Sequence, residues 1–84
     1  MVSKKHKGIV LMIYDDSYDS IEFIADVISY AMGYDETQAT TCAIIIKNKG
    51  KYAVKTFKTS EIQKARDTLQ LFNEHDISAE LIFL

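Results

Sequence analysis

The feature that most constrains this chain is an uncharged apolar run, residues 8–14, that stops at the carboxylates of Asp15 and Asp16. The run is rich in Ile, Val, Leu and Met, and its shortness favours a buried central strand over a helix. An amphipathic segment begins soon afterwards, at Ile21, so the chain passes from strand to helix through a short acidic turn. This strand is therefore expected at the centre of the fold, with the turn at its end.

The two segments after the acidic turn have helical periodicity. Asp19 followed by Glu22 has the form of an N-terminal capping pair, and Gly33 is a natural helix end. Asp35 followed by Gln38 predicts the start of a second helix, which ends at an Asn-Lys-Gly turn signal. The two apolar stripes consist of Ile21, Ile24, Val27, Ile28, Ala31 and Met32, and of Ala39, Cys42, Ala43 and Ile46.

The second half of the chain predicts a strand, a helix and a strand. Residues 51–58 alternate like a strand with one wet face, and Lys55 is expected on the open face of the sheet. Ser60 followed by Gln63 predicts the start of the third helix, and residues 77–84 predict the last strand. One face of the predicted strand carries Tyr52, Val54 and Thr56, and the other carries Ala53, Lys55 and Phe57. The apolar stripe of the third helix consists of Ile62, Ala65, Leu69 and Phe72.

The predicted order is therefore β-α-α-β-α-β in a single domain of residues 1–84, in which residues 1–7 are expected to be a flexible tail. Two helices between the first two strands make those strands antiparallel, and the first strand can also pair with the last. A three-stranded antiparallel sheet covered on one face by three helices buries every apolar stripe. The predicted fold class is an α+β two-layer sandwich.

Composition excludes several classes of function. Ten Lys and Arg stand against twelve Asp and Glu, so the chain lacks the basic surface of a nucleic-acid binder. A single cysteine, Cys42, excludes an internal disulfide and the common cysteine-rich zinc sites. The apolar stretches are too short to span a bilayer, so no membrane partner and a cytoplasmic location are expected.

The sequence carries few signals of catalysis. It holds no glycine-rich phosphate loop, no nucleophile elbow and no paired histidines of a metalloprotease. The carboxylates within residues 15–22 could hold Mg²⁺, but no ligand spacing requires it. A small metal-dependent enzyme is therefore only a third hypothesis, and a binding protein with no cofactor and no metal is expected.

The acidic turn itself has two interpretations. Asp and Ser are ordinary turn formers and helix caps, and this role alone accounts for them. Alternatively, two carboxylates fixed at the end of a strand, beside an apolar helix face, form a seat for an ammonium group. The residue types alone leave both interpretations open.

Several short motifs together resemble the bacterial and plastid ClpS adaptors. They are the Asp-Asp pair after the first strand, Tyr18-x-x-Ile21-Glu22-Phe23-Ile24-x-Asp26-Val27-Ile28, Gln38-Ala39-Thr40 and Lys49-Gly50-Lys51. The resemblance covers about residues 9–84 and implies a ClpS-like fold with the same order of elements. ClpS adaptors recognise proteins that carry a destabilising N-terminal residue and deliver them to the Clp AAA+ unfoldase. The resemblance thus implies two partners, substrate N-termini and the N-terminal domain of the unfoldase.

The resemblance also implies a ligand-binding site. An alignment without gaps places Asp15 and Asp16 on the family's Asn-Asp pair, which contacts the substrate's α-amino group. A gapped alternative keeps the two residues on the family's Asp-Asp and places Tyr14 on the asparagine. The remaining site residues implied by the ungapped alignment are Tyr18, Asp19 and Ile21 at the pocket rim, and Ile24 and Ala43 in the apolar wall.

Two positions depart from the family's pattern. Lys47 stands where the family has a histidine that helps to hold the α-amino group. At about 4 Å and an effective dielectric near 20, a lysine ammonium would repel a substrate ammonium by about 4 kcal/mol. Asp15 and Asp16 could offset that repulsion, or could pair with Lys47 and close the site. Ala43 replaces a larger methionine, which implies a different side-chain preference.

The resemblance places the unfoldase-docking surface at the start of the third predicted helix. Thr59, Glu61 and either Lys64 or Arg66 match the family's Thr-x-Glu followed by a basic residue. Two hypotheses follow. The protein is a ClpS-like adaptor that binds N-terminal residues, or a diverged interaction or regulatory domain of the same fold that no longer binds them.

Overall fold

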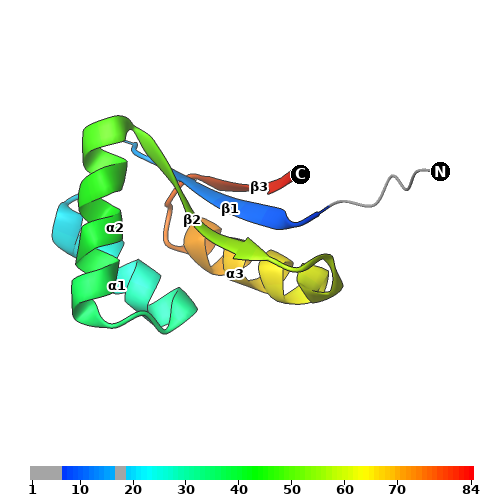
Figure 1. Ribbon diagram of the computed structural model, residues 1–84. Coiled ribbons are helices and arrows are strands. Elements are labelled where there is room, and N and C mark those ends of the chain that lie inside the picture. Colours follow the sequence, from blue (N-terminus) through cyan, green and yellow to red (C-terminus); the bar gives the residue numbers. More distant parts are fainter. Residues whose placement is uncertain (1–6, 17–18) are drawn as a thin grey trace.

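The computed structural model describes residues 7–16 and 19–84 (Figure 1). Its elements follow the predicted order, so the prediction of a β-α-α-β-α-β fold is confirmed. They are β1 (Ile9–Tyr14), α1 (Ile21–Met32), α2 (Glu36–Lys49), β2 (Lys51–Phe57), a 3-10 turn η1 (Thr59–Glu61), α3 (Ile62–Glu74) and β3 (Ala79–Phe83). The prediction of a flexible tail concerns residues 1–7, of which 1–6 lie outside the described residues.

The sheet has the strand order β2-β1-β3, and both pairs of strands are antiparallel. The uncharged strand β1 is therefore central, as its composition predicts. All three helices pack on one face of the sheet, with α3 alongside β1 and β3 and with α1 against α2 (Figure 1). The α+β two-layer sandwich expected from the sequence is thus confirmed.

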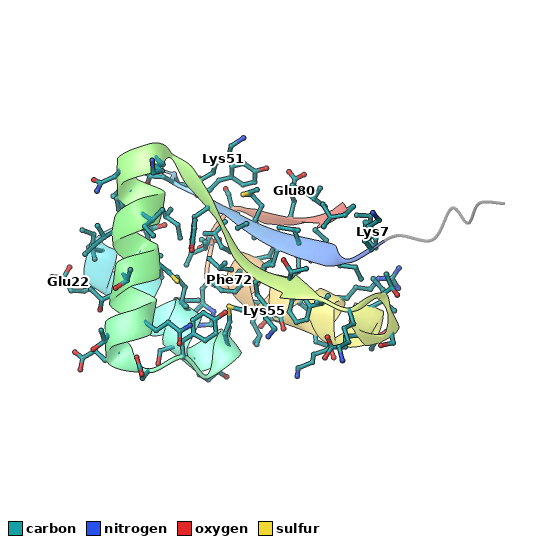
Figure 2. The ribbon with its side chains drawn as sticks, viewed as in Figure 1. Lys7, Glu22, Lys51, Lys55, Phe72 and Glu80 are labelled. Carbon is teal, nitrogen blue, oxygen red and sulfur yellow. The ribbon has the colours of Figure 1, made fainter. Side chains whose placement is uncertain are left out.

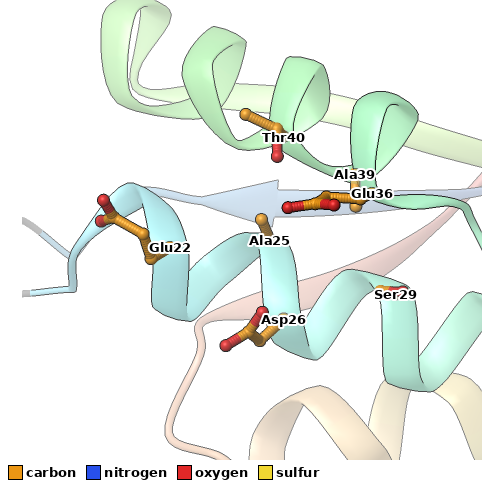
Figure 3. Close-up of a pocket in the computed structure, with 7 residues that line it drawn as sticks. All are labelled: Glu22, Ala25, Asp26, Ser29, Glu36, Ala39 and Thr40. Carbon is orange, nitrogen blue, oxygen red and sulfur yellow. The ribbon is translucent and has the colours of Figure 1, made fainter.

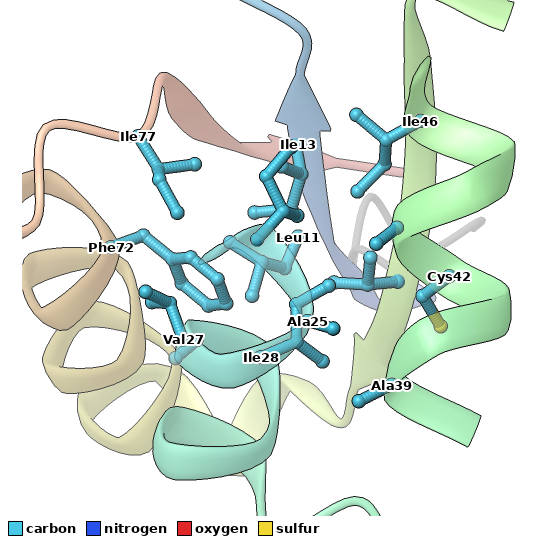
Figure 4. Packing of buried hydrophobic residues seen from close by; sticks show 14 of the residues in the cluster. Leu11, Ile13, Ala25, Val27, Ile28, Ala39, Cys42, Ile46, Phe72 and Ile77 are labelled. Atoms are coloured by element: carbon cyan, nitrogen blue, oxygen red, sulfur yellow. The ribbon is translucent and has the colours of Figure 1, made fainter. Parts of the chain in front are cut away.

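The core lies between the sheet and the helices. Alternate residues of β1, namely Ile9, Leu11 and Ile13, point into it, and each is almost completely buried. Phe72 of α3 and Ile28 of α1 meet these side chains, as Figure 4 shows for several members of the cluster. Burying each large aliphatic or aromatic side chain contributes about 1.5–3 kcal/mol. The apolar stripes predicted from periodicity are the surfaces that form this core.

Strand β2 contains an irregularity that strict alternation does not predict. Leu11 pairs with Lys55, whereas the next residue of β1 pairs with Ala53, so Val54 is an extra residue in β2. Because a bulge restarts the alternation, Val54 and Phe57 are both buried in the core, although the sequence pattern assigns them to opposite faces. That assignment was wrong.

The same bulge corrects the position of Lys55. Cross-strand partners share a face of the sheet, and the partner of Lys55 is the buried Leu11. Lys55 therefore lies on the helix-covered side rather than on the open face, and its ammonium is 5.3 Å from the ring centroid of Phe57. Figure 2 shows Lys55 on the side of β2 that faces the helices.

The helix caps match the sequence analysis only in part. For α1, the cap is Ser20 and not Asp19, since the amide of Phe23 donates to Ser20 Oγ at 3.0 Å. Ser20 has the extended backbone that directly precedes the first helical residue, which the cap position requires. The helix ends at Gly33 as predicted, with a φ of 73° that favours glycine.

The remaining two helices show one correct prediction and one error. Asp35 caps α2 by accepting from the amide of Gln38 at 2.8 Å, as predicted. The predicted pair of Ser60 and Gln63 does not cap α3, because the 3-10 turn η1 comes first. Instead, the amide of Lys58 donates to Glu61 Oε1 at 2.9 Å.

Candidate functional site

The acidic turn is anchored on both sides by the backbone. The amide of Tyr14 donates to the carbonyl of Ser78 at 2.9 Å, and the amide of Asp15 donates to the carbonyl of Gly50 at 2.9 Å. Ser78 directly precedes β3, and Gly50 directly precedes β2. The turn is therefore held between the entries to the two outer strands, where the pairing of β1 ends.

Asp15 forms an ion pair with Lys47, the residue that departs from the family pattern. The Lys47 ammonium lies 3.0 Å from Asp15 Oδ1, and the two side chains are only 23% and 16% exposed. Partial desolvation strengthens the attraction within the pair, while the hydration lost by both ions offsets part of that gain; an exposed pair contributes about 0–1 kcal/mol. Lys47 also stands in the last turn of α2, where the helix dipole favours a cation.

Asp16 is exposed and is held by a different partner. The hydroxyl of Ser78 donates to Asp16 Oδ1 at 2.8 Å. The two predicted ammonium ligands are therefore neighbours in the chain that contact different elements, α2 for Asp15 and the loop before β3 for Asp16. Ser78 contacts Asp16 across 62 positions, so no local sequence signal identifies it.

The predicted apolar wall is part of the core. Ile24 and Ala43 are 1% and 0% exposed, so neither offers surface to a ligand in this conformation. Ile21 is partly buried and packs against the same cluster, and Asp19 is also partly buried. Tyr18, predicted for the pocket rim, lies outside the described residues. The structure thus brings two of the predicted site residues, Asp15 and Lys47, into direct contact.

Tyr14, which the gapped alignment places on the family's asparagine, has another contact. Its hydroxyl donates to Glu80 Oε1 at 3.0 Å, which joins β1 to β3. Burial, together with the hydrogen bond and charge of Glu80, raises the pKa of the Tyr14 phenol above its ordinary value. Met12, two residues before Tyr14, pairs with Glu80. Because residues two apart share a face of the sheet, this contact lies on the open face, opposite the core.

The predicted docking residues gather at the start of α3. Thr59 and Glu61 lie in η1, and Lys64 and Arg66 are exposed on the first turns of α3. The hydrogen bond from the Lys58 amide is the main cause that lowers the pKa of Glu61, and nearby lysines add to it. Lys64 also lines a shallow cavity of about 80 Å³, together with Ala31, Met32, Lys55, Phe57 and Thr68.

Two further findings concern the described residues alone. No group of three or more His, Cys, Asp or Glu in residues 7–16 and 19–84 is arranged to hold a metal ion. In the same residues, none of the helices is both long and apolar enough to cross a membrane. Cys42 is buried on the inner side of α2, and burial raises the pKa of its thiol.

Comparison with solved structures defines the class of this fold. The chain is similar to the structure of Agrobacterium tumefaciens ClpS2 bound to L-phenylalaninamide, with a TM-score of 0.76 and 17% identity. The match covers 95% of this chain and 100% of that one. At such low identity the likeness shows the fold, which is that of a ClpS adaptor.

Comparison with family models then gives the family. The model described as ATP-dependent Clp protease adaptor protein ClpS matches residues 4–79, so the chain belongs to the ClpS family. The resemblance seen in the motifs is thereby confirmed. Members of this family are adaptors rather than enzymes. A comparison with curated proteins found no match.

Proposed function

We propose that this protein is an adaptor of a Clp AAA+ protease that binds the N-terminal residue of substrate proteins through Asp15 and Asp16. The observation that carries the proposal is the Lys47 ammonium, 3.0 Å from Asp15 Oδ1 in a partly buried position. An α-amino group at a chain terminus has the same charge and the same three donors as a lysine ammonium. Asp15 thus already accepts a group of this chemistry from Lys47, which supports the proposal.

Lys47 has a second consequence under this proposal. A substrate terminus must displace the Lys47 ammonium from Asp15 or share the carboxylates with it. Asp16, with one oxygen bonded to Ser78, is the second carboxylate available for sharing. Binding is therefore expected to be weaker than in a variant that lacks the lysine charge, because displacement costs the free energy of the existing pair.

Peptide binding tests the proposal directly. Fluorescence anisotropy with peptides that begin with Phe or Leu should show binding of the free amine at least tenfold tighter than of the N-acetylated form. Lys47→His should increase affinity for the free amine, whereas Asp15→Asn should lower it. Lys51→His, a change in an exposed lysine at the start of β2, is the matched control and should alter neither. Equal binding of free and acetylated peptides would remove the terminal-amine role.

Docking to the unfoldase is the second part of the proposed function. It rests on the family likeness and on the position of Thr59, Glu61, Lys64 and Arg66 at one end of α3. Calorimetry with the N-terminal domain of the cell's own Clp unfoldase should detect a complex. Lys64→Glu and Arg66→Glu, made separately, identify which basic residue contributes. Lys49→Glu, at the opposite end of the molecule on α2, serves as the control.

A specific observation also favours a second candidate function, a diverged ClpS-like interaction or regulatory domain that no longer binds N-terminal residues. Lys47 already neutralises Asp15, and Ile24 and Ala43 expose almost no surface. Such a domain would occupy the unfoldase without delivering cargo. If neither the wild type nor Lys47→His binds the free-amine peptides while the calorimetric complex forms, this second function is the correct one.

A further inference from the structure

Charge is segregated along this chain to an unusual degree. Residues 15–46 contain seven carboxylate side chains and no Lys, Arg or His, although the whole chain has ten Lys and Arg. The seven are Asp15, Asp16, Asp19, Glu22, Asp26, Asp35 and Glu36. These residues include all of α1 and the first three turns of α2. The surface formed by α1 and the first three turns of α2 is therefore acidic and holds no basic residue, whereas Lys47 and Lys49 stand in the last turn of α2.

The two helices enclose a groove on this surface. A cavity of about 270 Å³ lies between α1 and α2, with Glu22, Asp26 and Glu36 among its lining residues. The buried Ala25 and Ala39 also line it, and Figure 3 shows the side chain of Ala25 pointing from α1 towards α2, where Ala39 lies. The groove thus has a small apolar floor and an acidic border.

The three border carboxylates have no counter-charge in the part of the chain that the structure describes. All three are exposed, and none forms an ion pair or a side-chain hydrogen bond with residues 7–16 or 19–84. Glu22 and Glu36 each lie in the first turn of a helix, where the dipole favours a carboxylate. Asp26 lies in the middle of α1, one turn from Glu22, where two like charges destabilise a helix. Capping therefore does not account for Asp26.

We infer that this groove binds a lysine or arginine side chain of the segment that follows the bound N-terminal residue of a substrate. The aliphatic stem of such a side chain covers the floor formed by Ala25 and Ala39, while its cationic head lies among the three carboxylates. Two neutral hydroxyls, of Ser29 and Thr40, complete the lining. The substrate class is thus a protein whose N-terminal residue is followed closely by basic residues.

The position of the groove supports this assignment, which rests on the proposed function. Glu22 is the neighbour of Ile21, the predicted rim of the N-terminal residue site, so the groove begins within one helical turn of that site. From residue 22 to residue 29, α1 rises about 10 Å, which about three residues of extended peptide can span. A basic residue at the third to fifth position of a substrate therefore reaches the carboxylates.

The test compares peptides that differ only after the N-terminal residue. Phe-Ala-Arg-Arg-Ala, Phe-Ala-Ala-Ala-Ala and Phe-Ala-Glu-Glu-Ala peptides, each with the same C-terminal dye, are titrated against the wild type and the variant D26N/E36Q. The arginine peptide should bind the wild type about five- to tenfold tighter than the alanine peptide, and the advantage should shrink with added salt. In D26N/E36Q the advantage should fall below twofold, while the alanine peptide binds as before.

A control variant on α3 and a measurement by NMR test whether the groove itself causes the preference for the arginine peptide. D67N/E74Q removes two exposed carboxylates from α3 and should keep the arginine advantage. In ¹⁵N spectra, the arginine peptide should shift the amides of Ser29 and Thr40, and the alanine peptide should not. Equal binding of the arginine and glutamate peptides, or an advantage that persists in D26N/E36Q, would overturn the inference and leave the proposed function intact. Failure of all three peptides, even with Lys47→His, would overturn both.

Discussion

Two acidic regions adjoin α1, and they differ in how their charge is balanced. At the N-terminal side of the helix, Asp15 is partly buried and paired with Lys47, and Asp16 is bonded to Ser78. Along the face towards α2, Glu22, Asp26 and Glu36 are exposed and have no partner within the described residues. The first region has a cation within the described residues, and the second has none there, which is why we propose a cation of the substrate for it. A ligand must therefore compete at the first and meets no competitor at the second.

The largest expected effect concerns the packing behind the first region. Ile24→Ala should lower the free energy of unfolding by roughly 2–4 kcal/mol, because a fully buried side chain is lost and a cavity is left. Urea denaturation followed by circular dichroism measures the change. The same substitution at Ile44, which is 41% exposed, is the control and should cost less than about 1 kcal/mol. A small effect at Ile24 would show that the wall can open towards a ligand.

The next largest expected effect concerns the ion pair between Asp15 and Lys47. A double-mutant cycle with Asp15→Asn and Lys47→Met should give a favourable coupling of about 1 kcal/mol, because the pair is partly desolvated. Urea unfolding of the wild type and the three variants supplies the four free energies. A coupling near zero would mean that separating Lys47 from Asp15 costs no free energy. The two acidic regions would then no longer differ in how strongly their carboxylates are paired.

A smaller effect of opposite sign is expected in the groove. Asp26→Asn should raise the free energy of unfolding by about 0.2–0.5 kcal/mol, because it removes the repulsion between Asp26 and Glu22 one turn away. The gain should be larger at low ionic strength and should shrink in 1 M salt, since both groups are exposed. Thermal unfolding at two salt concentrations provides the measurement. A loss of stability would indicate that Asp26 has a favourable partner.

The smallest effect concerns a carboxylate whose partner is the backbone. The Lys58 amide lowers the folded-state pKa of Glu61, so this contact stabilises the fold above the unfolded-state pKa and is lost as the pH falls through the folded-state pKa. Carbon-detected NMR titration of the Glu61 carboxyl should give a pKa below its ordinary value, and the Lys58 amide signal should move with the same midpoint. Glu61→Gln should abolish that movement. A midpoint at the ordinary value would mean that the hydrogen bond is absent in solution.

The sequence predicts the elements better than it predicts their contacts. The uncharged run of β1 and the stripes of α1, α2 and α3 are local patterns, and the core confirms them. The bulge at Val54 is not visible in residues 51–58, because one extra residue leaves the composition of a strand unchanged. For the cap of α1, Asp19 and Ser20 are equally suitable by type, and only the backbone geometry selects Ser20.

The candidate site shows the same limit more clearly. The carboxylates of Asp15 and Asp16 could be recognised from their place after a strand, and Lys47 from its departure at a family position. Their partners could not be ranked, since pairing with Asp15 or with Asp16 was equally compatible with the sequence. The structure selects Asp15 for Lys47 and adds Ser78, which only the closure of the sheet brings near Asp16. Contacts across 32 and 62 positions depend on the whole fold.

The backbone bonds of the acidic turn couple distant parts of the chain to it. Since Tyr14 is bonded to Ser78 and Asp15 to Gly50, each outer strand begins directly after a residue whose carbonyl accepts from this end of β1. Fraying at either margin of the sheet would release one of these ties and leave the carboxylates less well oriented. Ser78, remote from Asp15 and Asp16 in sequence, therefore helps to position them, and under the proposed function a substitution that breaks its bonds would weaken binding of a substrate terminus.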